Sequence, residues 1–283
     1  MYDVIIIGAG AAGISAALTL KARNKNILWL GNPALSDKIS VSEKILNYPG
    51  LSAVSGQEFR AALLNQITEA GLVITQKQVT GVYNTGDRLT VLCGQESFDG
   101  RTVILAAGVE NVKRIDGELE FLGKGVSYCA TCDGFLYRGK TIAVVCTSKA
   151  FEEEVKYLAQ TAGKVYFVPM YKDVGIKAEN VEAIKQMPQA IEGENRVERL
   201  VFKGREIAVD GVFLLKSAVA PSALVPGIKT ENGQVVVDRA QRTNIPGLFA
   251  AGDCTGRPYQ YAKAVGEGNV AAHSACEYLD DKK

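Results

Sequence analysis

The first thirty residues carry the feature that most constrains the fold, a glycine-rich turn between an apolar strand and an alanine-rich helix. The strand is predicted over Val4–Ile7, the turn reads Gly8-Ala9-Gly10-Ala11-Ala12-Gly13, and the helix runs from about residue 14 to 23. In a G-x-G-x-x-G turn the first glycine permits the bend, the second lets a pyrophosphate approach, and the third allows close packing. With a second strand over Ile27–Leu30, this βαβ unit predicts a Rossmann-like fold that binds a dinucleotide, rather than a ligand-free turn.

Two further segments bear on which dinucleotide binds, one after the second strand and one near the C-terminus. The acid that usually holds a ribose after the second strand is absent, because Gly31-Asn32 stand there, and only the amide of Asn32 is left to bond the ribose. Near the C-terminus, the strand Leu248–Ala251 ends at Gly252-Asp253, where the aspartate is placed to accept a hydroxyl of a flavin's ribityl chain. A helix starts within Pro258–Ala262, and its positive end suits a reduced flavin. Together these segments favour FAD.

Length and composition indicate a globular protein of one or two domains. The chain has 283 residues, 47% of them apolar, and a second strand–helix–strand unit is predicted over about residues 141–168. No stretch has the roughly 18 consecutive apolar residues of a membrane span, and the N-terminus shows no secretory signal, so we expect a cytoplasmic protein. The net charge is +1 with intermixed acids and bases, which gives no indication of nucleic acid or membrane binding.

Two of the six cysteines, Cys129 and Cys132, have the spacing of a reversible disulfide, in which one thiolate can attack a partner. A zinc site is the alternative, but it needs two further ligands, and the chain has no second C-x-x-C and a single histidine, His273. We therefore expect no metal. Asp133 follows the second cysteine and is the candidate to shuttle protons to the leaving thiolates, although a surface turn would also place an acid there.

Several motifs together resemble the low-molecular-weight flavin thioredoxin reductases, over nearly the whole chain. They are Gly8–Gly13, Asn47–Gly50, Ala106–Gly108, Gly125–Gly134 with its C-A-T-C-D-G block, and Ala250–Asp253. The resemblance implies an α/β fold with two Rossmann-like domains of the three-layer ββα type. An FAD domain (1–111 and 237–283) would be split around a degenerate NADPH-type domain (112–236) that carries the cysteines. It also implies a homodimer, with Cys132 facing the flavin and Cys129 attacking thioredoxin.

The predicted site residues follow from these motifs. The catalytic residues are Cys129, Cys132 and Asp133. The residues expected to bind FAD are Gly8, Gly10, Ala11, Ala12, Gly13, Gly31, Asn32, Asn47, Gly108, Gly252, Asp253, Tyr259, Gln260, Tyr261 and Ala262.

The second βαβ unit departs from the members of that family that use a pyridine nucleotide. Cys146 and Ser148 stand where the first two glycines are needed, Phe151 replaces the third small residue, and residues 141–162 contain no glycine. The next strand ends at Val168–Lys172, without the arginine cluster that reads a 2′-phosphate. This pattern resembles the ferredoxin-dependent flavin thioredoxin reductases, which implies that electrons arrive from ferredoxin and that no NADPH binds.

Three alternatives stay open at this point. The chain could reduce thioredoxin with NAD(P)H through an unusual pocket, or reduce a different small disulfide such as a glutaredoxin-like protein. It could also be a flavin redox sensor without turnover, whose disulfide state controls a partner.

Overall fold

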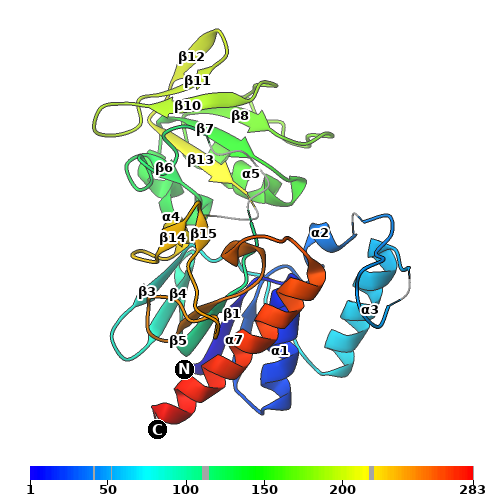
Figure 1. The fold of residues 1–283 in the computed structure, drawn as a ribbon. Helices are drawn as coiled ribbons and strands as arrows, with labels where there is room; N and C mark the ends of the chain where they lie inside the picture. The colour runs from blue at the N-terminus through cyan, green and yellow to red at the C-terminus, as the bar shows by residue number, and fades with distance from the viewer. Residues whose placement is uncertain (41, 52, 110–114, 217–219, 283) are drawn as a thin grey trace. The chain divides into compact units, whose positions relative to one another are not determined.

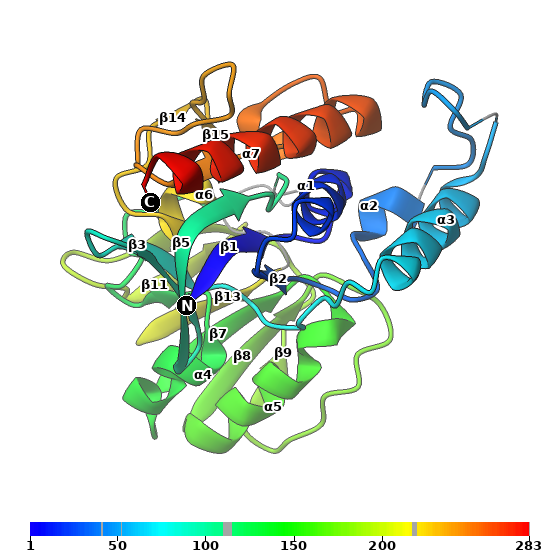
Figure 2. The same cartoon turned by 90° about the horizontal axis from the view of Figure 1, so that it is seen from below.

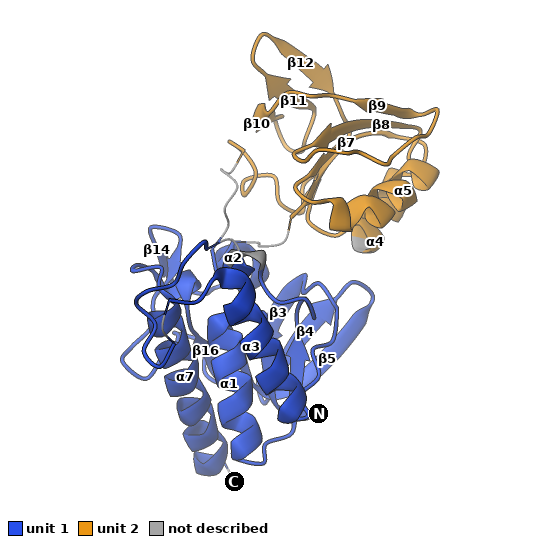
Figure 3. Ribbon diagram, turned by 90° about the vertical axis from the view of Figure 1, so that its right-hand side faces the viewer, with its two compact units in different colours: residues 1–109, 220–283 blue, residues 110–219 orange. Residues whose placement is uncertain are grey.

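A computed structural model describes the chain except for residues 41, 52, 110–114, 217–219 and 283. The chain divides into two compact units (Figure 3). Unit 1 comprises residues 1–109 and 220–283, and unit 2 comprises residues 110–219. Each unit has its own sheet and its own buried core. No helix of the described residues is long and apolar enough to cross a bilayer.

Unit 1 is built on a mixed sheet of six strands, in the order β2-β1-β5-β4-β3, with β16 paired to β5. Strands β2, β1, β5 and β16 run parallel, whereas β3, β4 and β5 form an antiparallel meander. The strands are β1 (Tyr2–Ile7), β2 (Ile27–Leu30), β3 (Gly81–Asn84), β4 (Leu89–Cys93), β5 (Glu96–Leu105) and β16 (Leu248–Ala250). A small hairpin, β14 (Thr230–Glu231) and β15 (Gln234–Val235), lies outside this sheet.

Two long helices pack side by side in unit 1, α1 (Ala11–Ala22) and α7 (Tyr261–Asp281) (Figures 1 and 2). A glycine makes this close packing possible, because a Cβ at Gly268 would stand 2.1 Å from the Ala12 carbonyl oxygen. The helix α3 (Gly56–Glu69) begins with the capping box that its sequence predicts, since Glu58 N–H donates to Ser55 Oγ and Ser55 N–H donates to the Glu58 carboxylate. The shorter helical elements are α2 (Asp37–Ser40), α6 (Pro221–Leu224) and η3 (Asp253–Thr255).

Unit 2 has a fully parallel five-stranded sheet in the order β6-β13-β7-β8-β9 and an antiparallel three-stranded sheet, β10-β11-β12. The helix α5 (Glu152–Thr161) packs on the parallel sheet through Val155 and Leu158. The strands are β6 (Val126–Ser127), β7 (Thr141–Cys146), β8 (Lys164–Pro169), β9 (Val181–Ala183), β10 (Pro188–Glu192), β11 (Arg199–Phe202), β12 (Arg205–Ala208) and β13 (Gly211–Leu215). The remaining turns are α4 (Ala130–Asp133), η1 (Gly134–Tyr137) and η2 (Lys149–Phe151).

The α/β class and the two Rossmann-like units agree with the sequence-based prediction, but one boundary does not. Residues 220–236 were expected in the inserted domain and belong to unit 1. The reason is a set of contacts with the segment before β16. Asn244 accepts a hydrogen bond from the backbone of Lys229 at 2.7 Å and donates one to the Gly227 carbonyl at 2.9 Å. The other expected boundary, between residues 111 and 112, lies outside the described residues.

Candidate active site

The first glycine turn has the geometry that its sequence predicts. Gly8 has a φ of +115°, and a Cβ there would stand 2.2 Å from the Ala106 carbonyl oxygen. A Cβ at Gly13 would lie 2.0 Å from the oxygen of Gly8, so only glycine fits at either position. Gly10, in contrast, has nothing within 4 Å of a Cβ position, and its backbone borders open space.

The N-terminus of α1 offers its backbone N–H groups to a ligand. Gly10 is the N-cap and supplies no side chain, and the first turn contains no acidic residue. Ala11 and Ala12 present only methyl groups there. Unsatisfied N–H groups and the positive end of the helix dipole favour a phosphate at such a position. This end of the site therefore suits a pyrophosphate.

A turn that includes Gly31, Asn32 and Ala34 follows the end of β2. Gly31 lies close to the first glycine turn, with Ala9 Cβ 3.0 Å from its Cβ position. The Asn32 side-chain oxygen accepts a hydrogen bond from the Ala34 N–H at 2.9 Å, in an Asx turn. Asn32 is an exposed residue, and its contact with a ribose hydroxyl stays a prediction.

The structure brings together two predicted residues that are 213 positions apart. Asn47 Nδ2 donates to Gln260 Oε1 at 2.7 Å. The neighbouring Tyr261 hydroxyl lies 3.1 Å from Ser42 Oγ, and its ring packs edge-on against Phe59 with centroids 5.4 Å apart. The loop around residue 47 is thus joined to the start of α7, whose first turn has no acidic residue and no side-chain cap.

The remaining predicted cofactor residues lie on turns and on the start of α7. Gly108 and Gly252 have positive φ angles of +70° and +87°. Asp253 opens η3 directly after Gly252. Tyr259 is 44% exposed and Ala262 is exposed, so both are on the surface of unit 1.

Two α7 residues that the sequence-based prediction missed hold the Gly252 peptide from both sides. Glu267 accepts hydrogen bonds from the Gly252 N–H and the Thr255 hydroxyl, both at 2.8 Å. Lys263 Nζ donates to the carbonyl oxygens of Gly252 at 2.8 Å and Gly256 at 2.7 Å, and lies 3.1 Å from Glu267. The i,i+4 spacing of Lys263 and Glu267 was the available signal. Their clamp fixes the backbone that leads into Asp253.

The residues of unit 1 fit an FAD molecule. A glycine turn with open backbone and an uncapped helix suit the pyrophosphate, and Asp253 suits a ribityl hydroxyl. A bound flavin would supply the ability to take up electrons singly and pass them on as a pair. Among the described residues, no group of three or more His, Cys, Asp and Glu side chains could hold a metal ion.

Cys129 is disulfide-bonded and lies between β6 and α4 in unit 2. Ser127 Oγ accepts from the Cys129 N–H at 3.0 Å and donates to the Asp133 carboxylate at 2.6 Å. The Asp133 N–H also bonds the Cys129 carbonyl oxygen at 3.3 Å. Cys132 lies on α4, but its side chain is outside the described part of the chain. Ser127, which the prediction missed, thus joins the first cysteine to the acid.

The second βα turn is built differently from the first. Cys146 ends β7, is fully buried, and donates to the Ser148 carbonyl oxygen at 3.2 Å. Ser148 caps η2 by accepting the Ala150 N–H at 3.3 Å. Glu152, the first residue of α5, accepts hydrogen bonds from the Gly175 N–H at 2.9 Å and the Tyr171 hydroxyl at 3.0 Å. The helix start is therefore occupied by this chain's own side chains and tied to the loop after β8.

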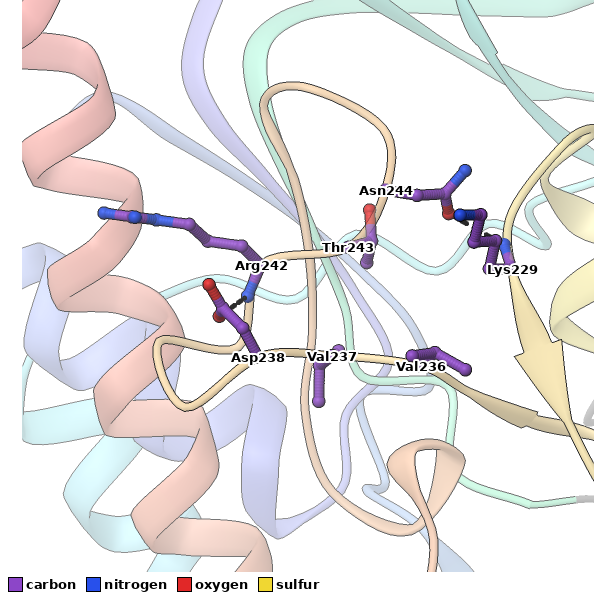
Figure 4. A pocket seen from close by; sticks show the side chains of 7 residues that line it. All are labelled: Lys229, Val236, Val237, Asp238, Arg242, Thr243 and Asn244. Atoms are coloured by element: carbon purple, nitrogen blue, oxygen red, sulfur yellow. Dashed lines mark hydrogen bonds between the residues drawn. The ribbon is translucent and has the colours of Figure 1, made fainter.

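A surface hollow of about 460 Å³ lies in unit 1, next to β15 (Figure 4). Two of its polar side chains belong to local turns, since Asp238 accepts the Arg242 N–H and Asn244 accepts the Lys229 N–H. No predicted site residue lines it, and we assign it no function. The lining residues are Lys229, Val236, Val237, Asp238, Arg242, Thr243 and Asn244.

Comparisons with known proteins agree with this arrangement. The family described as pyridine nucleotide-disulphide oxidoreductase matches residues 2–147 and 170–268. A thioredoxin reductase of Treponema pallidum is 33% identical over 99% of this chain and 97% of its own length.

Two solved structures are similar as well. A ferredoxin-flavin thioredoxin reductase from Clostridium acetobutylicum superposes with a TM-score of 0.92 and 43% identity, covering 99% of this chain and 98% of that chain. A thioredoxin reductase from Gloeobacter violaceus has a TM-score of 0.81 and 30% identity, covering 100% and 95%. With its glycine turn, its disulfide and these relatives, the chain belongs to the pyridine nucleotide-disulphide oxidoreductase family and is a disulfide oxidoreductase of the thioredoxin reductase type.

Proposed function

We propose that this protein is a flavin-dependent thioredoxin reductase that takes its electrons from reduced ferredoxin. In this proposal FAD is bound non-covalently by unit 1, the Cys129–Cys132 pair passes two electrons to thioredoxin, and the enzyme acts as a cytoplasmic homodimer. The observation that carries the choice of donor is the contrast between the two βα turns of the chain.

The two turns differ in what they offer to a phosphate. At α1 the helix start has no cap, no acid and open space beside Gly10. At α5 the first turn holds the carboxylates of Glu152, Glu153 and Glu154, which suit the helix dipole but repel a pyrophosphate. The Cys146 and Ser148 side chains also occupy the turn where a nucleotide would need bare backbone. These features support a nucleotide site in unit 1 and argue against one in unit 2.

The loop after β8 adds a second argument. In NADPH-binding domains this region supplies basic side chains to the 2′-phosphate. Here Tyr171, Val174 and Ile176 pack on the core of unit 2, and Glu152 ties the loop to α5. The chain's own apolar and acidic side chains therefore lie after the carboxyl ends of β7 and β8, where a nucleotide would bind.

Ferredoxin as donor is energetically suitable. A plant-type ferredoxin near −400 mV and a thioredoxin near −270 mV differ by roughly 130 mV, or about 6 kcal/mol for two electrons. Within the chain, we assign Cys129 to the attack on thioredoxin and Cys132 to exchange with the flavin. Asp133, held by Ser127, would give protons to the leaving thiolates.

The test is anaerobic mixing of the flavin-loaded protein with each donor while the flavin absorbance is followed. We expect an excess of chemically reduced ferredoxin, which delivers its electrons singly, to bleach the flavin band and to support turnover of thioredoxin disulfide. NADPH and NADH should leave the band unchanged over the same time. Rapid bleaching by either nucleotide would overturn the choice of donor.

The second candidate is a thioredoxin reductase that uses NAD(P)H through an atypical site. The family description, which names pyridine nucleotides, is the observation that favours it. The mixing experiment separates the two candidates directly. It also tests the flavin-sensor alternative, because a sensor would be reduced without sustained turnover of thioredoxin.

A further inference from the structure

We propose that Glu118, Lys216 and Tyr128 form a positioning cluster that holds the peptide entering Cys129 and thereby sets the stability of the redox disulfide. The inference rests on the proposed use of this disulfide in thiol exchange. It does not depend on which donor reduces the flavin.

The three side chains are buried and meet at one carboxylate. Glu118 is 2% exposed, Lys216 5% and Tyr128 8%. The Tyr128 hydroxyl donates to Glu118 Oε1 at 2.5 Å, and Lys216 Nζ lies 2.5 Å from the same oxygen. Lys216 Nζ also lies 5.1 Å from the centre of the Tyr128 ring. The second oxygen, Glu118 Oε2, accepts the Ile115 N–H at 3.3 Å.

Such a cluster needs an explanation other than stability. Removing two charges from water costs about as much free energy as their attraction returns, so buried ion pairs are weak evidence for stability. A buried, fully paired polar group instead fixes one arrangement of the chain, because moving it leaves a charge unpaired. What this group fixes is Tyr128, the residue that immediately precedes Cys129.

The strands next to the cluster connect Lys216 to the segment that leads into Cys129. Lys216 follows β13 directly, and β13 pairs with β6 through Val126 and Ser127. On its other side, Cys129 is tied to α4 by the Asp133 N–H. The position of Cys129 relative to α4 therefore depends on the anchoring of Tyr128 on the N-terminal side.

Anchoring of this kind changes a redox equilibrium. Reduction breaks the S–S bond, consumes two electrons and two protons, and yields two thiols. Oxidation forms the S–S bond again. A higher effective concentration of one thiol near the other favours oxidation. A looser Tyr128 lowers that concentration, so the disulfide becomes easier to reduce.

The experiment equilibrates the flavin-loaded protein with dithiothreitol redox buffers and quantifies the disulfide by alkylation and mass spectrometry. The variants are Tyr128→Phe, which removes only the hydroxyl, and Lys216→Met with Glu118→Gln, which removes both charges together. We expect each to shift the equilibrium about tenfold toward the dithiol, a midpoint about 30 mV less negative.

The matched control is Arg199→Met with Glu192→Gln, which removes an ion pair of the same unit that is 40% and 44% exposed. It should leave the equilibrium unchanged. A shift of at least threefold in the cluster variants, absent from the control, supports the proposal. A shift below threefold in the cluster variants, or an equal shift in the control, overturns the proposal. If the double variant does not fold, the shift of Tyr128→Phe alone decides. Failure of ferredoxin to reduce the flavin would leave this result untouched.

Discussion

Ser127 donates a 2.6 Å hydrogen bond to the Asp133 carboxylate while accepting the N–H of Cys129 at 3.0 Å. A single hydroxyl thus connects the disulfide-bonded Cys129 to the acid four residues further along the chain. The bond places the Asp133 carboxylate next to Cys129 along the chain, which is the arrangement that the proposed proton transfer to the leaving thiolates requires.

Replacing Asp133 by asparagine keeps the shape of this link and removes the group that we propose to transfer protons. We expect turnover of thioredoxin disulfide to fall by about 100-fold, within the range that general acid–base groups contribute. Ser127→Ala should have a smaller effect, since it loosens the acid without removing it. Turnover is measured with chemically reduced ferredoxin, and Glu182→Gln, at an exposed ion pair with Lys164, is the control. Full activity in Asp133→Asn would remove Asp133 from the mechanism.

The hydrogen bonds that Glu152 accepts from the loop after β8 predict a pH dependence of stability. Hydrogen bonds from the Gly175 N–H and the Tyr171 hydroxyl lower the pKa of Glu152 below its ordinary value of 4.5. A carboxyl with a lowered pKa in the folded state stabilises it fully above pH 4.5, and this contribution is lost as the pH falls through the folded-state pKa. Glu152→Gln should therefore destabilise the protein at neutral pH and flatten its acid sensitivity.

Thermal unfolding between pH 7 and pH 3 measures this effect. The melting temperature of Glu152→Gln should approach that of the unaltered protein as the pH falls. Glu153→Gln provides the control, because Glu153 is exposed and bonds the exposed Lys156 on the same helix. Parallel curves for Glu152→Gln and the unaltered protein would contradict the assignment.

The local features of the fold follow from the sequence, because each depends on neighbouring residues. The glycine turn at Gly8–Gly13, the capping box of Ser55 and Glu58, and the closing helix could all be read from patterns within a few turns of chain. The spacing of Cys129 and Cys132 indicated a redox pair for the same reason.

Features that join distant segments could not be predicted in this way. Glu118 and Lys216 are 98 positions apart, and neither stands in a pattern that identifies its partner. The contact between Asn47 and Gln260 depends on how a loop of unit 1 packs against α7. The difference between the predicted boundary and the compact units has the same origin, since Asn244 bonds residues 227–229, which lie in unit 1.

The clamp on Gly252 predicts a change in cofactor affinity. Lys263→Met with Glu267→Gln removes the hydrogen bonds that hold both sides of the Gly252 peptide, so Asp253 loses its fixed position. Charge-assisted hydrogen bonds of this type contribute about 1.5–3 kcal/mol each, and we expect FAD to bind at least about tenfold more weakly. Flavin fluorescence during titration of the apoprotein measures the affinity.

The control for this variant is an ion pair between the same helix and the segment before β16. Arg242 and Glu277 form an ion pair at 3.6 Å near the C-terminal end of α7, and both are exposed. Arg242→Met with Glu277→Gln should bind FAD as the unaltered protein does. Equal affinities for both double variants would show that the clamp does not support the cofactor.

Three buried cysteines outside the disulfide, Cys93, Cys146 and Cys254, should be inert, because burial disfavours their thiolates. It raises the pKa of Cys93 and of Cys146 to about 11, and that of Cys254 to about 12. At pH 8 a thiol with a pKa of 11 is about 0.1% thiolate, and only the thiolate reacts. After reduction of the disulfide, iodoacetamide should therefore modify Cys129 within minutes and leave these three untouched, as peptide mass spectrometry would show. In denaturant all should react alike, and rapid labelling of Cys146 in the folded protein would mean that the second βα turn is open rather than filled by its own side chains.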